Sequence, residues 1–103
     1  MTLPGLDPLI HAPVRLQICA ILSAADEAEF ALVREETGVS ESVLSKQVKL
    51  LEEAGYVAVR KATLASRQRT WLALTKAGRA AFATHMRALT QLAEQAAAGL
   101  AAE

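Results

Sequence analysis

Short hydroxyl side chains and lysines recur at helical spacing shortly after residue 40. These residues are Ser42, Ser45, Lys46 and Lys49. At about 100° per residue they lie roughly opposite an apolar face of Leu44, Val48 and Leu51. Serine hydroxyls hydrogen-bond to bases or phosphates at close range, and lysines neutralise phosphates or reach guanine, so this polar face suits the major groove of DNA. The alternative is an ordinary amphipathic helix with a solvated face, and this stretch alone does not separate the two.

Two glycines bracket this segment and place it in a larger motif. Gly38 follows a short helical pattern over residues 31–37 and fits a helix C-terminus. Ser40 is placed to cap the next helix with its hydroxyl, and Gly55 ends that helix. Two helices joined by a tight glycine-containing turn predict a helix-turn-helix, of which the second helix is the reading helix.

The hydrophobic period changes after Gly55. Residues 56–60 alternate as a strand, residues 63–68 are typical of a hairpin tip, and residues 69–74 form a second strand. A two-stranded hairpin directly after a reading helix is a wing. Its tip carries Arg67, flanked by Arg69 and opposite Arg60 and Lys61, which places an arginine to enter the minor groove of DNA. The alternative for Arg67 is a solvated turn residue.

The distribution of charge supports this interpretation although the net charge of the chain is zero. Eight basic and two acidic residues lie between positions 45 and 79, so that segment carries +6 and the remainder carries −6. A basic patch concentrated on the expected reading elements is the electrostatic footprint of a DNA-binding protein.

Helices are predicted on both sides of the reading unit. Residues 14–22 form an apolar belt wider than one core face, which predicts contact with a partner chain. Thr75 caps a final alanine-rich helix that runs to about Gly99. The apolar stripe of this helix is too long to pack wholly on so small a domain and is expected to pair with its copy in a second chain. The expected interface residues are Leu16, Phe82, Met86, Leu89, Leu92 and Ala96.

Other functions find little support in the residue types. Cys19 is the single cysteine, so a buried thiol in a reduced cytoplasmic setting is expected. His11 is expected at the surface or at a helix cap, far in sequence from His85, and no metal site or cofactor is predicted. No nucleophile–base pair or phosphate loop indicates an enzyme. The N-terminus lacks the pattern of a signal peptide, and no apolar stretch is long enough to span a bilayer.

With these elements in order, the chain resembles compact winged-helix transcriptional regulators of the MarR type. The matching residues are 13–18, Phe30 with Leu32, 37–40, 44–57 and 69–82. The resemblance covers about residues 5–95. It implies a homodimer that reads a pseudo-palindrome in double-stranded DNA, with its two reading helices one DNA turn apart.

Two departures from that family affect what the resemblance implies. Residues 62–68 lack the Asp-x-Arg signature common in the wings of larger relatives. The chain also lacks the extended flanking helices that build a ligand pocket in those relatives. A small-molecule effector is therefore permitted but not indicated.

The predicted architecture is a single winged helix-turn-helix domain over residues 1–103, mainly α with a small β-hairpin. Its reading unit is residues 30–74 and its dimerisation helix is residues 75–100. The expected function is that of a sequence-specific DNA-binding regulator, and the alternative is a winged-helix module for protein–protein assembly. The expected DNA-binding residues are Ser40, Ser42, Ser45, Lys46, Gln47, Lys49, Arg60, Lys61, Arg67 and Arg69.

Overall fold

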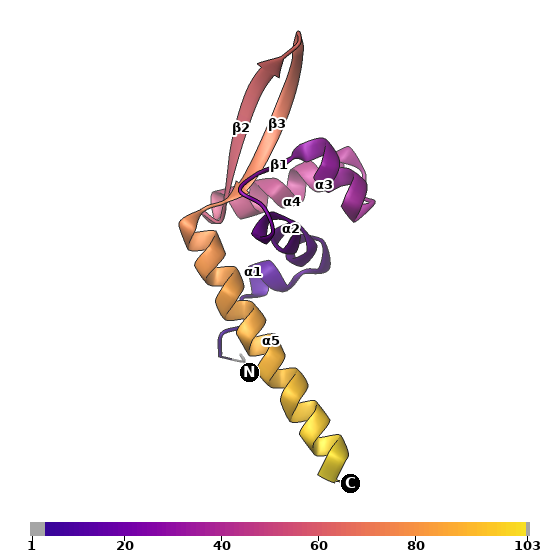
Figure 1. Cartoon of the computed structure of the whole chain (residues 1–103), viewed down its shortest axis with the longest axis vertical. Helices are drawn as coiled ribbons and strands as arrows, with labels where there is room; N and C mark the ends of the chain where they lie inside the picture. Colours follow the sequence, from indigo (N-terminus) through magenta and orange to yellow (C-terminus); the bar gives the residue numbers. More distant parts are fainter. Residues whose placement is uncertain (1–3, 103) are drawn as a thin grey trace.

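Helices and a three-stranded antiparallel sheet make up residues 4–102, the part of the chain that the computed structural model describes (Figure 1). The helices are α1 (Pro8–His11), α2 (Pro13–Ser23), α3 (Phe30–Thr37), α4 (Glu41–Glu53) and α5 (Lys76–Ala102). The strands are β1 (Ala28–Glu29), β2 (Val57–Leu64) and β3 (Arg67–Leu74). The predicted fold class, a winged helix-turn-helix followed by a long C-terminal helix, is confirmed.

The turn between α3 and α4 depends on the two residues that the sequence singled out. Gly38 has a left-handed φ of 72°, and its N–H donates to the Arg34 carbonyl oxygen at 2.9 Å. Glycine adopts this φ without the strain that a Cβ would add, which ends α3. The Ser40 hydroxyl accepts a hydrogen bond from the Val43 N–H at 3.2 Å and caps α4. Both predicted caps of the helix-turn-helix are therefore confirmed.

The hairpin of β2 and β3 is longer than the sequence predicted. The two strands pair from Val57 and Leu74 to Leu64 and Arg67, so the tip is residues 65–66 rather than 63–68. Both tip residues have positive φ, 52° and 65°, as a two-residue hairpin turn requires. The outer half of the hairpin is largely exposed on both faces, so its residues show no apolar alternation that would mark a strand.

A third strand, β1, was not predicted. It pairs antiparallel with β3 through Ala28 opposite Leu72 and Glu29 opposite Trp71, which makes β3 the central strand. The sequence predicted no helix or strand between the helical patterns of residues 14–22 and 31–37. A strand of two residues is too short to show a period, and its pairing depends on the neighbouring edge of β3.

The core lies where α2, α4 and the sheet meet. The predicted inward face of α4 is buried, and it packs with apolar residues of the neighbouring elements. The main contributors are Ile18, Leu22, Leu44, Val48, Leu51, Val57 and Leu72. Each such side chain contributes roughly 1.5–3 kcal/mol on burial, so the orientation of α4 is fixed by its apolar face and its polar face must point outward.

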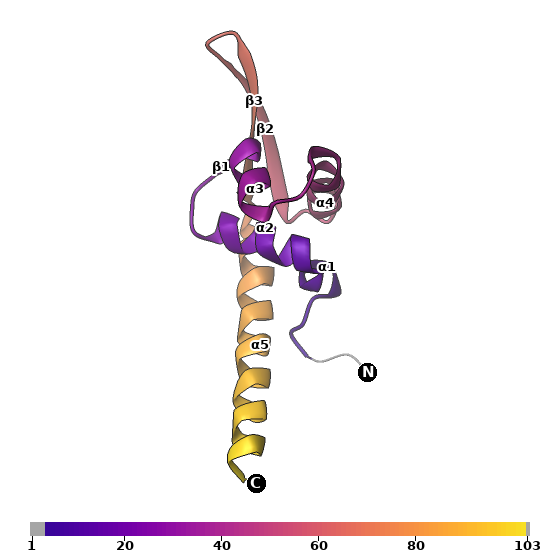
Figure 2. The same cartoon turned by 90° about the vertical axis from the view of Figure 1, so that its right-hand side faces the viewer.

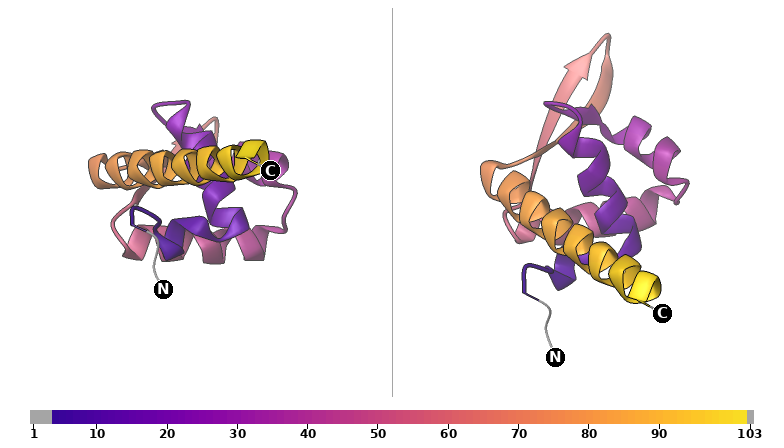
Figure 3. Two further views of the ribbon diagram at one scale, coloured as in Figure 1. Left: turned by 90° about the horizontal axis from the view of Figure 1, so that it is seen from below. Right: turned by 60° about the horizontal axis from the view of Figure 1, so that its bottom comes forward.

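Helix α5 begins on the body of the molecule and then leaves it. The Thr75 hydroxyl accepts from the Gly78 N–H at 3.0 Å, as expected of the cap. Residues 90–101 are all exposed, and the molecule measures 62 × 25 × 23 Å. Figure 1 shows the C-terminal half of α5 projecting from the end opposite the hairpin. Two further views show α2 between α4 and α5 (Figures 2 and 3).

No helix in residues 4–102 has the length and apolar character needed to cross a membrane.

Candidate nucleic-acid interface

The outward face of α4 carries the four residues from which the sequence argument began. Ser42, Ser45, Lys46 and Lys49 are all exposed, while Leu44 on the opposite face is fully buried. These side chains therefore have access to a partner along one side of the helix. Ser40 is also exposed, but its hydroxyl oxygen already accepts the bond that caps α4.

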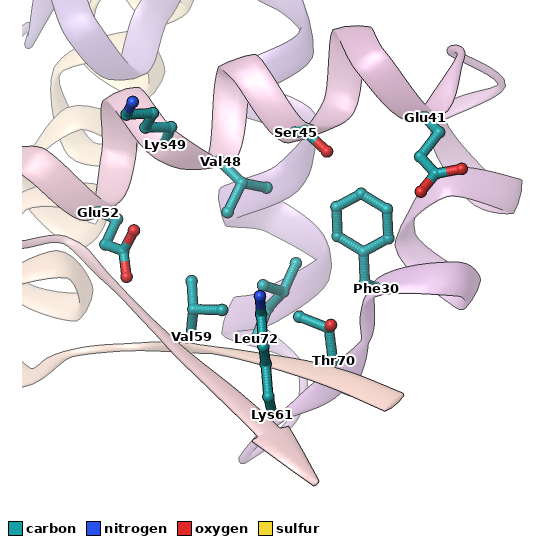
Figure 4. A pocket seen from close by; sticks show the side chains of 10 residues that line it. All are labelled: Phe30, Glu41, Ser45, Val48, Lys49, Glu52, Val59, Lys61, Thr70 and Leu72. Atoms are coloured by element: carbon teal, nitrogen blue, oxygen red, sulfur yellow. The ribbon is translucent and has the colours of Figure 1, made fainter. Parts of the chain in front are cut away.

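A groove of about 400 Å³ separates α4 from the hairpin. Its apolar floor is formed by Phe30, Val48, Val59 and Leu72 (Figure 4). Polar side chains from both walls surround that floor. They are Ser45, Lys49, Glu41 and Glu52 from α4, and Lys61 and Thr70 from the hairpin. Lys61 points from β2 toward α4, so the wing contributes a positive charge to the same side of the molecule as the exposed face of α4.

The basic residues of the hairpin divide between its two faces. Side chains alternate along a strand, so Lys61 on β2 shares one face with Thr70 opposite it, and Arg60 shares the other face with Trp71. Arg69, opposite Ala62, lies on the same face as Arg60. The sequence grouped these three residues as one basic patch, and the strand register corrects that grouping.

Arg60 and Arg69 are held by glutamates at the edge of the sheet. The Arg60 guanidinium donates to Glu27 at 2.6 Å and lies 5.6 Å from the centroid of the Trp71 ring. The Arg69 guanidinium donates to both carboxylate oxygens of Glu29, at 2.9 and 3.1 Å. Both arginines therefore brace the hairpin against the segment around β1, and they lie on the face turned away from the groove.

Arg67 differs from these two arginines. It shares the face of Arg69 by strand alternation, but it is exposed and follows the tip residues directly, opposite Leu64. The structure thus keeps Arg67 at the end of the wing, where the sequence placed it.

Gln47 faces the body of the protein rather than the exposed side of α4. Its Oε1 accepts a hydrogen bond from the Arg15 guanidinium at 2.6 Å, and the same guanidinium donates to the Leu9 carbonyl oxygen. Arg15 thereby joins α1, α2 and α4. This contact occupies the Gln47 Oε1, and the expectation that Gln47 binds DNA stays a prediction. Arg15 was missed, although a single cation within the apolar run 14–22 was a signal for it.

The residues expected at a dimer interface differ in how far they are buried. Phe82 packs against the core of the same chain, as does Leu16 of α2, so both contribute to the monomer. Met86 and Leu92 remain 40% and 42% exposed, and Leu89 between them is partly exposed. With the exposed Ala96, these residues form what we call the α5 stripe: Met86, Leu89, Leu92 and Ala96.

The two histidines, distant in sequence, meet in the fold. His11 is exposed, as predicted. Its Nδ1 lies 3.2 Å from His85 Nε2, so the imidazole of His85 is its hydrogen-bond partner. Among the described residues, no group of three or more histidine, cysteine or acidic side chains could hold a metal ion. Cys19 is buried, as expected, and its burial raises the pKa of the thiol to about 11.

Comparison with known proteins identifies the protein family to which this chain belongs. Residues 14–93 match the family model of a winged helix DNA-binding domain. The chain therefore belongs to the family of winged-helix DNA-binding domains. The uncharacterized protein MJ0432 of Methanocaldococcus jannaschii is 29% identical over 86 residues, which cover 84% of this chain and 94% of that protein.

Solved structures with a similar fold include transcriptional regulators, one of which is of the MarR family. A transcriptional regulator homologue from Pyrococcus horikoshii OT3 matches with a TM-score of 0.79 and 24% identity, over 84% of this chain and 86% of that one. A MarR-family transcriptional regulator from Silicibacter pomeroyi matches with a TM-score of 0.65 and 25% identity, over 84% of this chain and 57% of that one. The resemblance to MarR-type regulators is confirmed.

Proposed function

We propose that this protein is a sequence-specific DNA-binding transcriptional regulator that acts as a homodimer. One observation carries the proposal: the exposed serine and lysine face of α4 continues across the groove to Lys61 on the wing. Helix and wing thus offer one hydrogen-bonding surface on which Lys46, Lys49 and Lys61 outnumber Glu41 and Glu52. A duplex with its phosphates outside and its base edges in the grooves requires such a surface.

The reading helix α4 is assigned to the major groove. Ser42 and Ser45 have short side chains that let the helix axis approach the base edges, where a hydroxyl can bond to any base pair. Lys46 and Lys49 are long enough to reach either guanine or a flanking phosphate. The proposed contact set on α4 is therefore Ser42, Ser45, Lys46 and Lys49, with Ser40 in the role of helix cap.

The wing is assigned a smaller share of the contacts than the sequence suggested. Lys61 would meet a phosphate beside the groove, and Arg67 at the tip would enter the adjacent minor groove. Arg60 and Arg69 would fix the orientation of the hairpin through their ion pairs with Glu27 and Glu29 instead of binding DNA.

The α5 stripe is proposed as the seam between two copies of the chain. It is apolar, it lies on a part of α5 that projects from the body, and leucines spaced three residues apart suit helix-to-helix packing. Pairing through α5 would bring two α4 helices, one from each chain, into one dimer. Each α4 helix could then bind one of the two half-sites of an operator.

Selection from a pool of random duplex DNA at two salt concentrations tests the proposal. Enrichment of an inverted repeat with half-sites about ten base pairs apart is the expected result. A variant with Lys46→Gln and Lys49→Gln should lose the enrichment. The variant with Lys76→Gln and Arg87→Gln on α5, which also removes two exposed positive charges, is the matched control and should retain the enrichment. Salt-sensitive binding without an enriched sequence would contradict specific recognition.

A second candidate function is a winged-helix module for protein–protein assembly. It is favoured by Val43 and Leu50, which are 41% and 36% exposed on α4. Apolar side chains on a reading helix add area to a protein interface but no hydrogen bonds to base edges. Absence of DNA binding at both salt concentrations would select this candidate over the regulator.

A further inference from the structure

His85 is buried in the monomer with both ring nitrogens in use. The Asp7 N–H donates to its Nδ1 at 2.9 Å, and its Nε2 lies 3.2 Å from His11 Nδ1. The two rings are tilted by 55° with centroids 5.2 Å apart. His85 is fully buried on α5, whereas His11 at the end of α1 is exposed. We call these two residues the histidine pair.

The hydrogen-bond donors fix one protonation state for the histidine pair. Because a backbone N–H can only donate, His85 Nδ1 must carry no proton, and the proton of the neutral ring sits on Nε2. Nε2–H then donates to His11 Nδ1, which must also be free of a proton. An added proton on His85 Nδ1 would face the Asp7 N–H, and one on His11 Nδ1 would face His85 Nε2–H. Either proton removes one of the two hydrogen bonds.

The groups around the histidine pair compensate that positive charge only in part. The Asp7 carboxylate is already an acceptor for the Tyr56 hydroxyl at 2.7 Å and for the Leu9 N–H at 2.9 Å. On α2, Cys19 is a buried neutral thiol, and the Arg15 guanidinium is bonded to Leu9 and Gln47. On α5 itself, Arg87 bonds back to Thr84.

The titration of His85 agrees with this geometry. Burial lowers the pKa of His85 below its usual 6.5, the charge of His11 lowers it further, and the charge of Asp7 opposes both to a smaller extent. A lowered histidine pKa means that the unfolded chain binds protons more readily than the fold does. The stability due to neutral His85 is therefore complete above about pH 6.5 and is lost as the pH falls through the folded value.

We propose that the histidine pair is an acid-sensitive contact that holds α5 against the N-terminal segment and is released when either ring is protonated. Asp7 connects this contact to Tyr56, which lies in the turn between α4 and β2, so the turn that follows the reading helix is linked to α5. In the homodimer, release would allow the orientation of α4 relative to the α5 seam to vary. Affinity for an operator with two half-sites would then fall with acidity, by up to about tenfold per pH unit for each proton taken up on release. This consequence for DNA rests on the proposed function, whereas the contact itself does not.

Histidine ring NMR of the full chain, with a metal chelator present, tests the contact directly. At about pH 7.5 we expect His85 as the Nε2–H tautomer and cross-relaxation between the two rings. At an acidic pH at which the ring shifts report a protonated ring, we expect the inter-ring signals to vanish and the Asp7 amide resonance to shift, in a chain that stays folded. Inter-ring signals that persist unchanged once a ring is protonated would overturn the proposal.

Two substitutions separate the pair from other titrating groups, because His11 and His85 are the only histidines in the chain. His85→Asn keeps an acceptor for the Asp7 N–H and cannot titrate in this range. His11→Asn, at an exposed position where folding should survive, keeps an acceptor for His85 Nε2–H. The free energy of unfolding of each variant should depend less on pH between about 5.5 and 7.5 than that of the wild type. An equal pH dependence in His11→Asn and wild type would overturn the role of the pair.

Operator binding at the same two pH values completes the test. Wild type should bind more weakly at the lower pH, and the double variant His11→Asn/His85→Asn should show little change. Equal acid sensitivity of the double variant would overturn the link to DNA while leaving the NMR result to decide the contact. Loss of the inter-ring signals in a chain that binds no DNA at any pH would instead show that the proposed function failed and that the contact stands.

Discussion

Gly78, in the first turn of α5, lies directly against the backbone of Tyr56. A Cβ on Gly78 would overlap the Tyr56 carbonyl group, and that carbonyl accepts the Thr75 N–H at 3.0 Å. Because the contact is with backbone, the neighbour cannot turn aside. Gly78→Ala should therefore destabilise the fold by roughly 1–3 kcal/mol, as overpacking does, despite the better helix propensity of alanine. Urea unfolding of the two proteins measures this difference.

Gly99 provides the matched control on the same helix. It is exposed, and nothing lies within 4 Å of the position that a Cβ would occupy. Gly99→Ala should leave stability unchanged or raise it by up to about 1 kcal/mol. Equal losses in the two variants would mean that glycine is needed in α5 for a reason other than the contact with Tyr56.

Adjacent residues on β2 should differ in their effect on DNA binding. Lys61 lines the groove beside α4, whereas Arg60 on the opposite face is bound to Glu27. Lys61→Gln should weaken binding and reduce the slope of log affinity against log salt by about 0.9 for each phosphate that the protein no longer neutralises. Arg60→Gln should leave that slope unchanged. Titrations at several salt concentrations measure both, and a reduced slope for Arg60→Gln alone would reverse the assignment of the two faces.

The hairpin tip holds two residues in a conformation that favours asparagine and glycine. Ala65 and Ser66 both have positive φ. Replacing them with Asn and Gly, the usual pair for such a turn, should stabilise the tip by about 1 kcal/mol. Amide hydrogen exchange should then slow about fivefold for the outer residues of the hairpin and stay the same in α2. An unchanged rate at the tip would show that the turn is not strained.

Charge on the α5 stripe should separate the proposed dimer. Leu89→Glu or Leu92→Glu would bury a carboxylate in the seam, and sedimentation should then show a monomer. Gln95→Glu adds the same charge to the exposed surface of α5 outside the stripe and should leave the dimer intact. A dimer that survives both leucine substitutions would place the seam elsewhere.

The elements that the sequence predicted well are those with a local physical signal. The apolar spacing of Leu44, Val48 and Leu51 determines which face of α4 turns inward, and therefore that its serines and lysines turn outward. Gly38 and Ser40 mark the helix-turn-helix because their backbone and side-chain preferences act within a few residues. The winged-helix class follows from these signals and their order.

Other parts of the candidate site depend on contacts between distant segments. Arg60 and Arg69 were grouped with Lys61 because they are close in sequence, but a strand sends neighbours to opposite faces, and the segment around β1 then supplies glutamates to two of the three. Arg15 and Gln47 are 32 residues apart and meet only after α2 packs on α4. No local pattern contains such partners.

The histidine pair shows the same division most clearly. Its two members are 74 positions apart, and the residues around each of them predict only that His11 lies at the surface. Only the packing of α1 and the N-terminal segment on α5 brings the two rings together. The same packing buries His85 beside the Asp7 N–H, which donates to it. Residue types and periodicity are local properties and determined the elements of this protein. Which charges remain free, and which are paired, was decided by the tertiary structure, because pairing depends on distances that exist only once the chain has folded.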